Sequence, residues 1–173
     1  MPARVSLNDM SNQVDPQTQF DWAIWLPSVP GGPYSTRDFT FRATTTSIPG
    51  LTLEEFKVEA QGLQFQHPGR RVWDQKLDVT VFETRDGVAK GLMEGWIDFI
   101  RNVRANTGNY KASFAVQAEI NLYDAPGNVT QRIGLQGFYP LTLGTANLDQ
   151  TSALLTYTCG FSYDRTIPLP LNG

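Results

Sequence analysis

The sequence predicts a mainly β protein, an antiparallel β-sandwich or partly open barrel with one packed α-helix. Three observations lead to this fold class. Apolar and polar residues alternate in several separate runs, as strands with one buried face require. Only one run, near the middle of the chain, has its apolar residues at helical spacing. Turns rich in glycine and proline separate the runs, and a chain of 173 residues is expected to form one domain.

The predicted strands follow a polar N-terminal segment. Residues 1–19 are polar and aperiodic, which predicts a flexible arm, either simply disordered or ordered on assembly. Residues 20–165 are expected to form the β domain, and residues 166–173, TIPLPLNG, a C-terminal tail. The runs that predict strands are FDWAIWL, RDFTFRATTTS, LEEFKVEAQGLQFQ, KLDVTVFET, FAVQAEINLYD, VTQRIGLQGF and ALLTYTCGFSYDR.

Turn residues divide these runs. Gly62 is expected to break the extended segment around it, and Pro68-Gly69 is expected to form a turn. APGN turns the chain between two alternating runs, so residues 114–138 are expected to form a hairpin. The stretch YPLTLGTANLDQTS, residues 139–152, is expected to be a connector before the last strand.

One helix is predicted, over residues 86–105. Asp86 is its expected N-cap, and Gly91 and Gly95 are expected to let another backbone approach closely. The apolar face that should pack on the outer side of the sheet consists of Val88, Leu92, Trp96 and Ile100. The outward polar face consists of Lys90, Glu94, Asp98 and Arg101.

The composition limits the kinds of partner. Apolar residues make up 40% of the chain, charged residues 18%, and the net charge is -3. Charge this sparse fits either a surface covered by partners or a strand-rich domain with Thr, Gln and Asn on its faces. Tight nucleic-acid binding depends on clustered Lys and Arg, so the negative net charge argues against it. A neutral or acidic wall past which DNA slides is compatible with this charge.

The residues that could support catalysis or metal binding are few. His67 is the single histidine and no serine lies in a GxSxG motif, so a hydrolytic triad lacks its parts. Cys159, the single cysteine, excludes an intrachain disulfide and lies in a strand-like run, which predicts a buried thiol. Carboxylates do not cluster with other metal ligands, and no phosphate-binding glycine loop precedes the helix. We therefore expect no enzymatic activity, no metal and no cofactor.

The stretch FQHPGRRVW, residues 65–73, looks most like a site. It places His67 beside a Pro-Gly pair and two adjacent arginines, Arg70 and Arg71. Two arginines and one tryptophan are a weak signal for nucleic-acid binding. Surface arginines, or arginines that pair with acids of a neighbouring subunit, are the favoured interpretations.

The order of these segments resembles the tail tube proteins of contractile-tailed phages and, more distantly, the tube protein of type VI secretion. The early pattern ATTTSIPGLTLEEFKVEAQGLQFQHPGRRVWDQKLDVTVFETRDG matches a strand, a turn, an extended segment, a Pro-Gly-Arg loop and a second strand. GLMEGWIDFIRN matches the single helix with a central tryptophan. Residues 120–165 match a closing hairpin, an aromatic-proline connector and a final strand. The resemblance covers residues 20–165, and the two terminal segments depart from it.

The resemblance implies a phage tail-tube-like fold and a structural role. Members of this family form hexameric rings whose strands join edge to edge into one β-barrel, and the rings stack into a tube inside a contractile sheath. A closed ring removes open sheet edges, and head-to-tail stacking gives a filament. The implied partners are further copies of the chain, the tail sheath protein, and baseplate and tail-terminator proteins. DNA would leave the capsid through the lumen without specific binding.

Three surfaces follow as hypotheses. A projecting loop that reaches a neighbouring subunit or ring would contain Phe65, His67, Pro68, Gly69, Arg70 and Arg71. A small polar strand face lining the lumen, or an ordinary solvent face, would consist of Thr156, Thr158 and Ser162. A sheath contact would use the outward helix face that carries Lys90, Glu94, Asp98 and Arg101.

The predicted location is the virion tail, after synthesis in the host cytoplasm. No N-terminal signal peptide and no apolar run of membrane-spanning length are visible, so no membrane anchor is expected. The alternative functions are a tube protein of type VI secretion or of another contractile injection system, or a phage baseplate or tail-terminator protein. A terminator would form one ring rather than a filament.

Overall fold

The computed structural model describes residues 21–31, 35–124, 126–146, 148 and 153–171, so the predicted arm at 1–19 lies outside the described residues. Its elements in chain order are β1 (Trp22–Trp25), α2 (Thr36–Arg42), β2 (Ala43–Thr46), β3 (Leu51–Ala60), β4 (Leu63–Trp73), β5 (Lys76–Phe82), α3 (Val88–Ile100), β6 (Arg101–Asn102), β7 (Thr107–Gly108), α4 (Lys111–Phe114), β8 (Val116–Tyr123), β9 (Val129–Leu143), β10 (Thr156–Ser162) and β11 (Arg165–Pro168). The mainly β, antiparallel fold class is confirmed, and the strands of the described residues form open sheets rather than a closed barrel.

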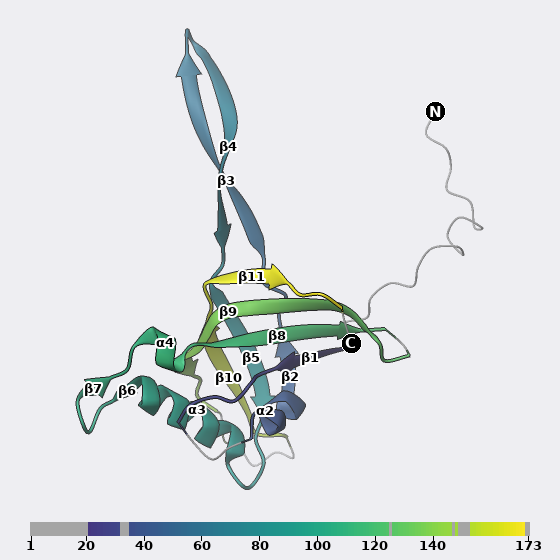
Figure 1. The fold of residues 1–173 in the computed structure, drawn as a ribbon, viewed down its shortest axis with the longest axis vertical. Helices are drawn as coiled ribbons and strands as arrows, with labels where there is room; N and C mark the ends of the chain where they lie inside the picture. The colour runs from purple at the N-terminus through teal and green to yellow at the C-terminus, as the bar shows by residue number, and fades with distance from the viewer. Residues whose placement is uncertain (1–20, 32–34, 125, 147, 149–152, 172–173) are drawn as a thin grey trace.

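The main sheet of the described residues has the strand order β1-β8-β9-β10-β5-β2, with β11 also beside β9 (Figure 1). The long strand β9 joins two halves, because its first part pairs with β8 and β11 and its second part with β10. Between the two parts, the β8–β9 register shifts and Gly137 adopts φ +66°, a conformation that glycine reaches without steric cost. The two halves thereby face each other across a core, as in a sandwich.

The core is built from inward-facing residues of both halves and from α3. Trp96, which is fully buried, lies at its centre, with ring centroids 6.4 Å from Phe138 and 6.3 Å from Phe161. The rings of Phe138 and Phe161 stack at 4.5 Å. The indole N–H of Trp96 donates to the carbonyl of Phe114 at 3.0 Å, so its one polar atom is satisfied inside the core.

The helix α3 is shorter than the predicted 86–105, and its N-terminus differs from the prediction. The N-cap is Gly87, and Asp86 makes no capping hydrogen bond. The side chain of Glu83 takes this role, since its carboxylate accepts the backbone N–H groups of Ala89 at 3.1 Å and Lys90 at 2.7 Å. A carboxylate in this position satisfies free N–H groups and interacts favourably with the helix dipole.

The expected close approach to α3 is present at Gly95. A Cβ added to Gly31 would lie 2.2 Å from the carbonyl oxygen of Gly95, so the two backbones are in direct contact. On the same helix, Ala89, Leu92, Met93 and Trp96 are buried, while Val88 and Ile100 are only half-buried.

Three sequence-based expectations about secondary structure were wrong. The run RDFTFRATTTS forms a strand only from Ala43, because Thr36–Arg42 is the helix α2. The expected connector at 139–152 begins as strand, since β9 continues to Leu143. The expected tail at 166–173 begins inside β11, which pairs with β9. The hairpin expected at 114–138 is confirmed from Val116 by the antiparallel pair β8–β9, while Phe114 belongs to the short helix α4.

Candidate functional site

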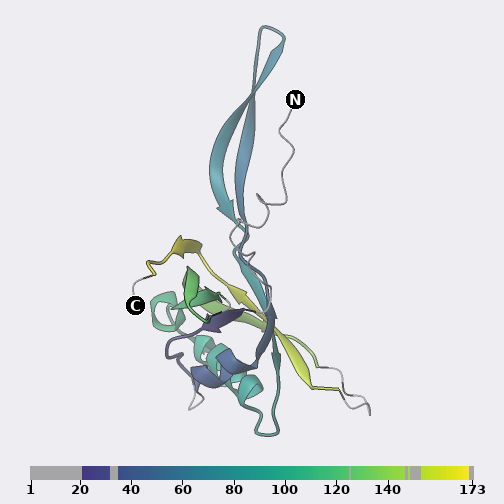
Figure 2. The ribbon, with the colours of Figure 1, turned by 90° about the vertical axis from the view of Figure 1, so that its right-hand side faces the viewer.

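The most distinctive feature of the structure is a long two-stranded hairpin, formed by β3 and β4. It projects from one end of the body along the longest axis of the molecule (Figures 1 and 2). Its strands pair with each other and with no other strand of the described residues. The hairpin is continuous in the chain with two strands of the main sheet, because β2 leads into β3 and β4 leads into β5.

The turn of the hairpin lies at Gln61-Gly62, and the turn predicted at Pro68-Gly69 is wrong. Gln61 and Gly62 have φ values of 51° and 78°, and they connect the paired residues Ala60 and Leu63. Two positive φ values in a two-residue loop are typical of a type I′ turn. Gly62 thus ends the first strand as expected, while the chain continues through Pro68-Gly69 as part of β4.

Pro68 and Gly69 instead lie at a β-bulge. Leu53 pairs with Arg71 and Glu55 with Pro68, so two residues of β4, Gly69 and Arg70, oppose the single residue Glu54. A Cβ on Gly69 would lie 3.0 Å from the carbonyl oxygen of Glu54, which explains why a glycine suits this close approach.

Across the bulge, Arg70 forms an ion pair within the hairpin. Its Nε donates to Oε2 of Glu54 at 2.7 Å, and its Nη2 donates to Oε1 at 3.3 Å. The hydrogen bond from Arg70 holds the pKa of the Glu54 carboxyl below its usual value. The sequence suggested an acidic partner on a neighbouring subunit, whereas Arg70 pairs with Glu54 of its own hairpin.

One face of the outer half of the hairpin is apolar. Phe56 pairs with His67, and Val58 pairs with Phe65, so these side chains share a face. Phe56 and His67 stack with ring centroids 5.5 Å apart. We call Phe56, Val58, Leu63, Phe65 and His67 the apolar hairpin face. The opposite face pairs Lys57 with Gln66 and Glu59 with Gln64. The apolar residues remain about half exposed, with fractions from 40% for Val58 to 63% for Leu63.

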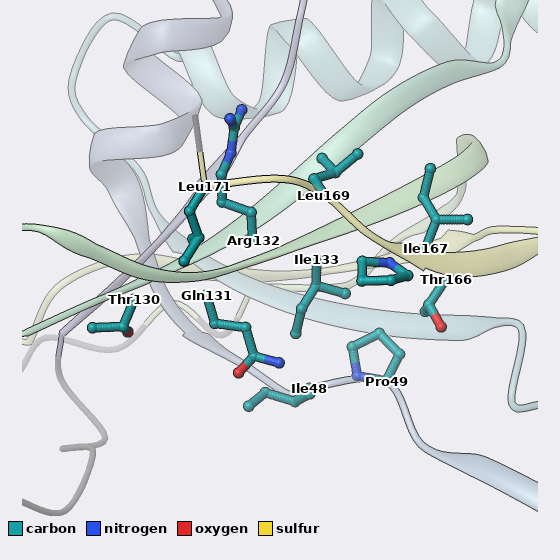
Figure 3. A pocket seen from close by; sticks show the side chains of 11 residues that line it. Ile48, Pro49, Thr130, Gln131, Arg132, Ile133, Thr166, Ile167, Leu169 and Leu171 are labelled. Atoms are coloured by element: carbon teal, nitrogen blue, oxygen red, sulfur yellow. The ribbon is translucent and has the colours of Figure 1, made fainter. Parts of the chain in front are cut away.

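The base of the hairpin is fastened to the body beside a shallow groove. The indole N–H of Trp73 donates to Oγ1 of Thr166 at 3.0 Å, which joins β4 to β11. Next to this contact is the base groove (Figure 3), whose lining residues are Ile48, Pro49, Thr130, Gln131, Arg132, Ile133, Thr166, Ile167, Pro168, Leu169 and Leu171. Arg132 is held there by Glu119 at 2.7 Å and by the carbonyl of Pro170 at 3.4 Å.

A second surface is the outer face of the half-sheet formed by β2, β5, β10 and the end of β9. Thr156 and Thr158 are exposed on it, while Ser162 is half-buried. Thr158 pairs with Thr80, and a Cβ on Gly160 would lie 2.4 Å from Oγ1 of Thr142, so hydroxyls of neighbouring strands share this face. We call Thr80, Thr142, Thr156, Thr158 and Ser162 the hydroxyl face. The charged residues paired next to it are Lys76 and Asp78, one of each sign.

Three of the four residues predicted on the outward helix face lie on α3, and Arg101 does not. Lys90, Glu94 and Asp98 are exposed on α3, and Lys90 pairs with Glu94 at 3.6 Å. Arg101 is exposed just beyond the helix, in β6. The surface they form has mixed charge, and Asp98 also lines a pocket with Asn102, Val103 and Arg104.

The described residues contain no group of three or more His, Cys, Asp or Glu side chains that could hold a metal ion. His67 lies on the exposed hairpin face, stacked on Phe56. Burial raises the pKa of the Cys159 thiol to about 12, so this side chain stays protonated at neutral pH. No described helix is long and apolar enough to cross a membrane.

Sequence reasoning missed Glu54 as the partner of Arg70 and missed the extent of the apolar hairpin face. The signal was present in LEEFKVEAQGLQFQ, where two alternating runs flank Gln61-Gly62. A two-residue turn at that point would have brought Val58 opposite Phe65.

The chain matches a family described as phage tail tube protein over residues 16–167. It is 28% identical over 156 residues to the tail tube protein of Serratia phage KSP90, covering 87% of this chain and 88% of that protein.

Two solved structures share the fold. The first is the sheath/tube terminator of the PVC extracellular contractile injection system in its extended state, with TM-score 0.64, 13% identity, and coverage of 91% of this chain and 99% of that chain. The second is the PVC sheath-tube complex, with TM-score 0.59, 14% identity, and coverage of 95% and 97%. The terminator and the sheath-tube structures match this chain about equally well.

Proposed function

Because the chain belongs to the phage tail tube protein family, we propose that its copies form hexameric rings that stack into a hollow tube. The observation that carries this proposal is the combination of open sheet edges with a projecting, half-apolar hairpin. An isolated monomer gains nothing from either feature, whereas a closed and stacked assembly uses both.

Ring closure would use the half-sheet that carries the hydroxyl face. Its strand order leaves β2 at one edge, and the end of β9 at the other edge is paired on one side only, by β10. Pairing β2 of one copy with residues 139–143 of β9 in the next would continue the antiparallel hydrogen bonding around the ring. No open edge of this half-sheet would then remain.

The hydroxyl face would line the lumen of such a ring. Thr156, Thr158 and Ser162 point away from the core, and α3 covers the opposite side. Lys76 and Asp78, which pair with Ser162 and Gly160, carry opposite charges, so they would add no net charge to the adjoining surface. Since affinity for DNA depends on clustered cations, DNA would pass along this face without being held.

The hairpin would join each ring to the next. The residues predicted from the sequence, Phe65 and His67 through Arg71, all lie on β4 and are exposed. Phe65 and His67 would supply apolar contact, while Arg71 would remain available for an acid of a neighbouring copy. Arg70 would act through Glu54, by fixing the bulge that sets the direction of the outer half.

The outer surface would carry the exposed residues of α3, Lys90, Glu94, Asp98 and neighbouring Arg101, toward a contractile sheath. Baseplate and terminator proteins would contact the two ends of the tube, and the finished assembly would be part of a virion tail made in the host cytoplasm. The role is structural, with no catalytic step assigned to the chain.

Negative-stain electron microscopy of the purified protein tests this function. We expect hollow tubes built from stacked six-fold rings. Single rings that never stack, at any protein concentration, would favour a terminator-type protein instead. Particles without rotational symmetry would contradict the proposal.

A further inference from the structure

The strand β5 runs from the base of the hairpin to the opposite end of the body. The hairpin enters β5 at its first residue, Lys76, through the short connection from Trp73. At the other end of β5, Val81 pairs with Ala43 of β2 on one side and with Tyr157 of β10 on the other. A strand of this length spans roughly 20 Å, so the two ends are separated by the depth of the body.

Exposed apolar side chains gather at that opposite end. Phe41, at the end of α2, is 66% exposed, and Leu154, just ahead of β10, is 72% exposed. The two flank the end of β5, because Arg42 pairs with Glu83 at 3.6 Å and the Glu83 N–H donates to the carbonyl of Leu155 at 2.8 Å. We call Phe41 and Leu154 the acceptor patch.

The acceptor patch also carries a cation. The guanidinium of Arg37 lies over the Phe41 ring, 5.3 Å from its centroid. The outer half of the hairpin, from Glu55 to Gln66, carries two glutamates and one lysine. Arg37 would therefore attract the net negative charge of the outer hairpin, although the apolar residues provide most of the contact area.

The base groove cannot serve as the receiving surface in a head-to-tail stack. Ile48 and Pro49 of this groove lead directly into β3, and Thr166 contacts the end of β4, so the groove lies at the end from which the hairpin leaves. In a polar filament every hairpin points the same way, and each one meets the far end of the next copy. That end carries Phe41 and Leu154.

We infer that the acceptor patch, Phe41 and Leu154, receives the apolar hairpin face of a second copy of this chain. The inference rests on the proposed function, since it requires a head-to-tail stack. The contact is heterologous: the donor surface and the acceptor surface are different parts of the same molecule. Each ring thus has one donor end and one acceptor end.

This polarity provides a sharp test with two kinds of variant. Phe65→Glu removes the donor and leaves the acceptor intact, while Phe41→Glu with Leu154→Glu removes the acceptor and leaves the donor intact. All three positions are exposed, so the monomers should fold, which circular dichroism and thermal unfolding check. Val103→Glu is the matched control, because Val103 is equally apolar and exposed but lies beyond α3, near neither surface.

We expect each variant alone to form rings and to show about tenfold fewer tubes or less, because a buried unpaired carboxylate disrupts an apolar contact. Rings of the two kinds, assembled separately and then mixed, should form stacks of two rings and no longer tubes. In such a stack the Phe41→Glu, Leu154→Glu ring supplies the intact hairpins. The Phe65→Glu ring supplies the intact acceptor patch. The Val103→Glu protein should form normal tubes.

The outcomes separate the inference from the proposed function. Normal tubes from the Phe41→Glu, Leu154→Glu protein, with Phe65→Glu still arrested at rings, would overturn the acceptor patch and leave hairpin stacking in place. Normal tubes from the Phe65→Glu protein would contradict the proposal that the hairpin joins successive rings. If a variant fails to form rings, a crosslinking experiment replaces it. The protein then carries Phe65→Cys and Leu154→Cys in a Cys159→Ala background, and a short bismaleimide should link successive copies into a covalent ladder. The absence of a ladder would overturn the inference.

Discussion

The body and the hairpin of this chain place their apolar residues in opposite environments. In the body, Val79, Trp96 and Phe161 are almost completely buried among residues of both half-sheets and α3. In the hairpin, Phe56 and Phe65 remain about half exposed, and β3 and β4 contact mainly each other. A two-stranded hairpin has too little burial to be stable by itself in water.

From this difference we infer that the body determines folding, and it supports the proposal that the hairpin serves assembly. Removal of apolar area from water contributes about 25 cal/mol per Å². The body obtains this contribution within one chain, whereas the hairpin obtains it only when another surface covers it. Substitutions in the body should therefore change the free energy of unfolding of the monomer, and substitutions in the hairpin should change assembly.

The largest effect is expected at Trp96. Trp96→Ala should lower the free energy of unfolding by about 3–5 kcal/mol, because it empties the centre of the core. It also leaves the Phe114 carbonyl without its indole donor. Urea unfolding of the monomer, kept below the concentration at which it assembles, measures the change. In the hairpin, Phe65→Ala should change the same quantity by less than about 0.5 kcal/mol. Equal losses at both positions would contradict the division between body and hairpin.

The next effect concerns the point where β9 passes between the two half-sheets. Gly137→Ala should destabilise the monomer by about 2–3 kcal/mol, because Gly137 has a positive φ that disfavours a Cβ, and the new Cβ would also meet Asp164. That Cβ would lie 2.2 Å from Oδ2 of Asp164, which can move away only by giving up Lys111. Gly127→Ala is the matched control, since Gly127 has φ +91° but open space around its Cβ, and it should cost about 1 kcal/mol. A Gly137→Ala protein no less stable than Gly127→Ala would show that the junction tolerates movement.

A smaller effect is expected at the start of α3. Glu83→Ala should cost about 1–3 kcal/mol, because two backbone N–H groups of the helix lose their acceptor and Arg42 loses its buried partner. Asp86→Ala should change thermal unfolding much less, as Asp86 is exposed and caps nothing. If Asp86→Ala lowered the stability of the monomer more than Glu83→Ala, Asp86 would be the residue that caps the helix.

The error at Asp86 illustrates what local sequence can and cannot predict. Asp86 has the right residue type and position for a cap, but Glu83, directly after β5, reaches the helix end across the loop between them, and the path of that loop is not visible in the cap pattern. The period-two reading of RDFTFR failed for a related reason. Phe39 is buried and Phe41 exposed, which suits one turn of helix, and seven residues are too few to distinguish the two periods.

The stronger sequence signals predicted the structure well. The runs around Val79, Ile120 and Phe161 alternate over enough residues to fix which face is buried, and all three residues lie in the core. Pro68-Gly69 misled because this pair more often marks a turn than a bulge. In a two-stranded ribbon with two open edges, the missing N–H of Pro68 leaves no partner unsatisfied. The proposed acceptor patch had no sequence signal, since Phe41 and Leu154 are far apart in the sequence and only the pairing of β2 and β10 with β5 places both at one end of the body.

The smallest effect on folding is expected at the bulge of the hairpin. Arg70→Glu with Arg71→Glu should leave the unfolding midpoint of the monomer unchanged, because Arg70 and Glu54 are solvent-exposed and their pair is screened. The lowered pKa of Glu54 means that the pair contributes above the usual carboxyl pKa and is lost as the pH falls through the lowered value. Tube formation at neutral pH should nevertheless decrease, since three carboxylates would then meet at the bulge and turn the outer half of the hairpin away from its partner. Exchanging the charges, Glu54→Arg with Arg70→Glu, keeps the pair and leaves Arg71 in place, so it should restore tubes. If the exchanged protein assembles no better than the double reversal, the direction of the hairpin does not depend on this pair.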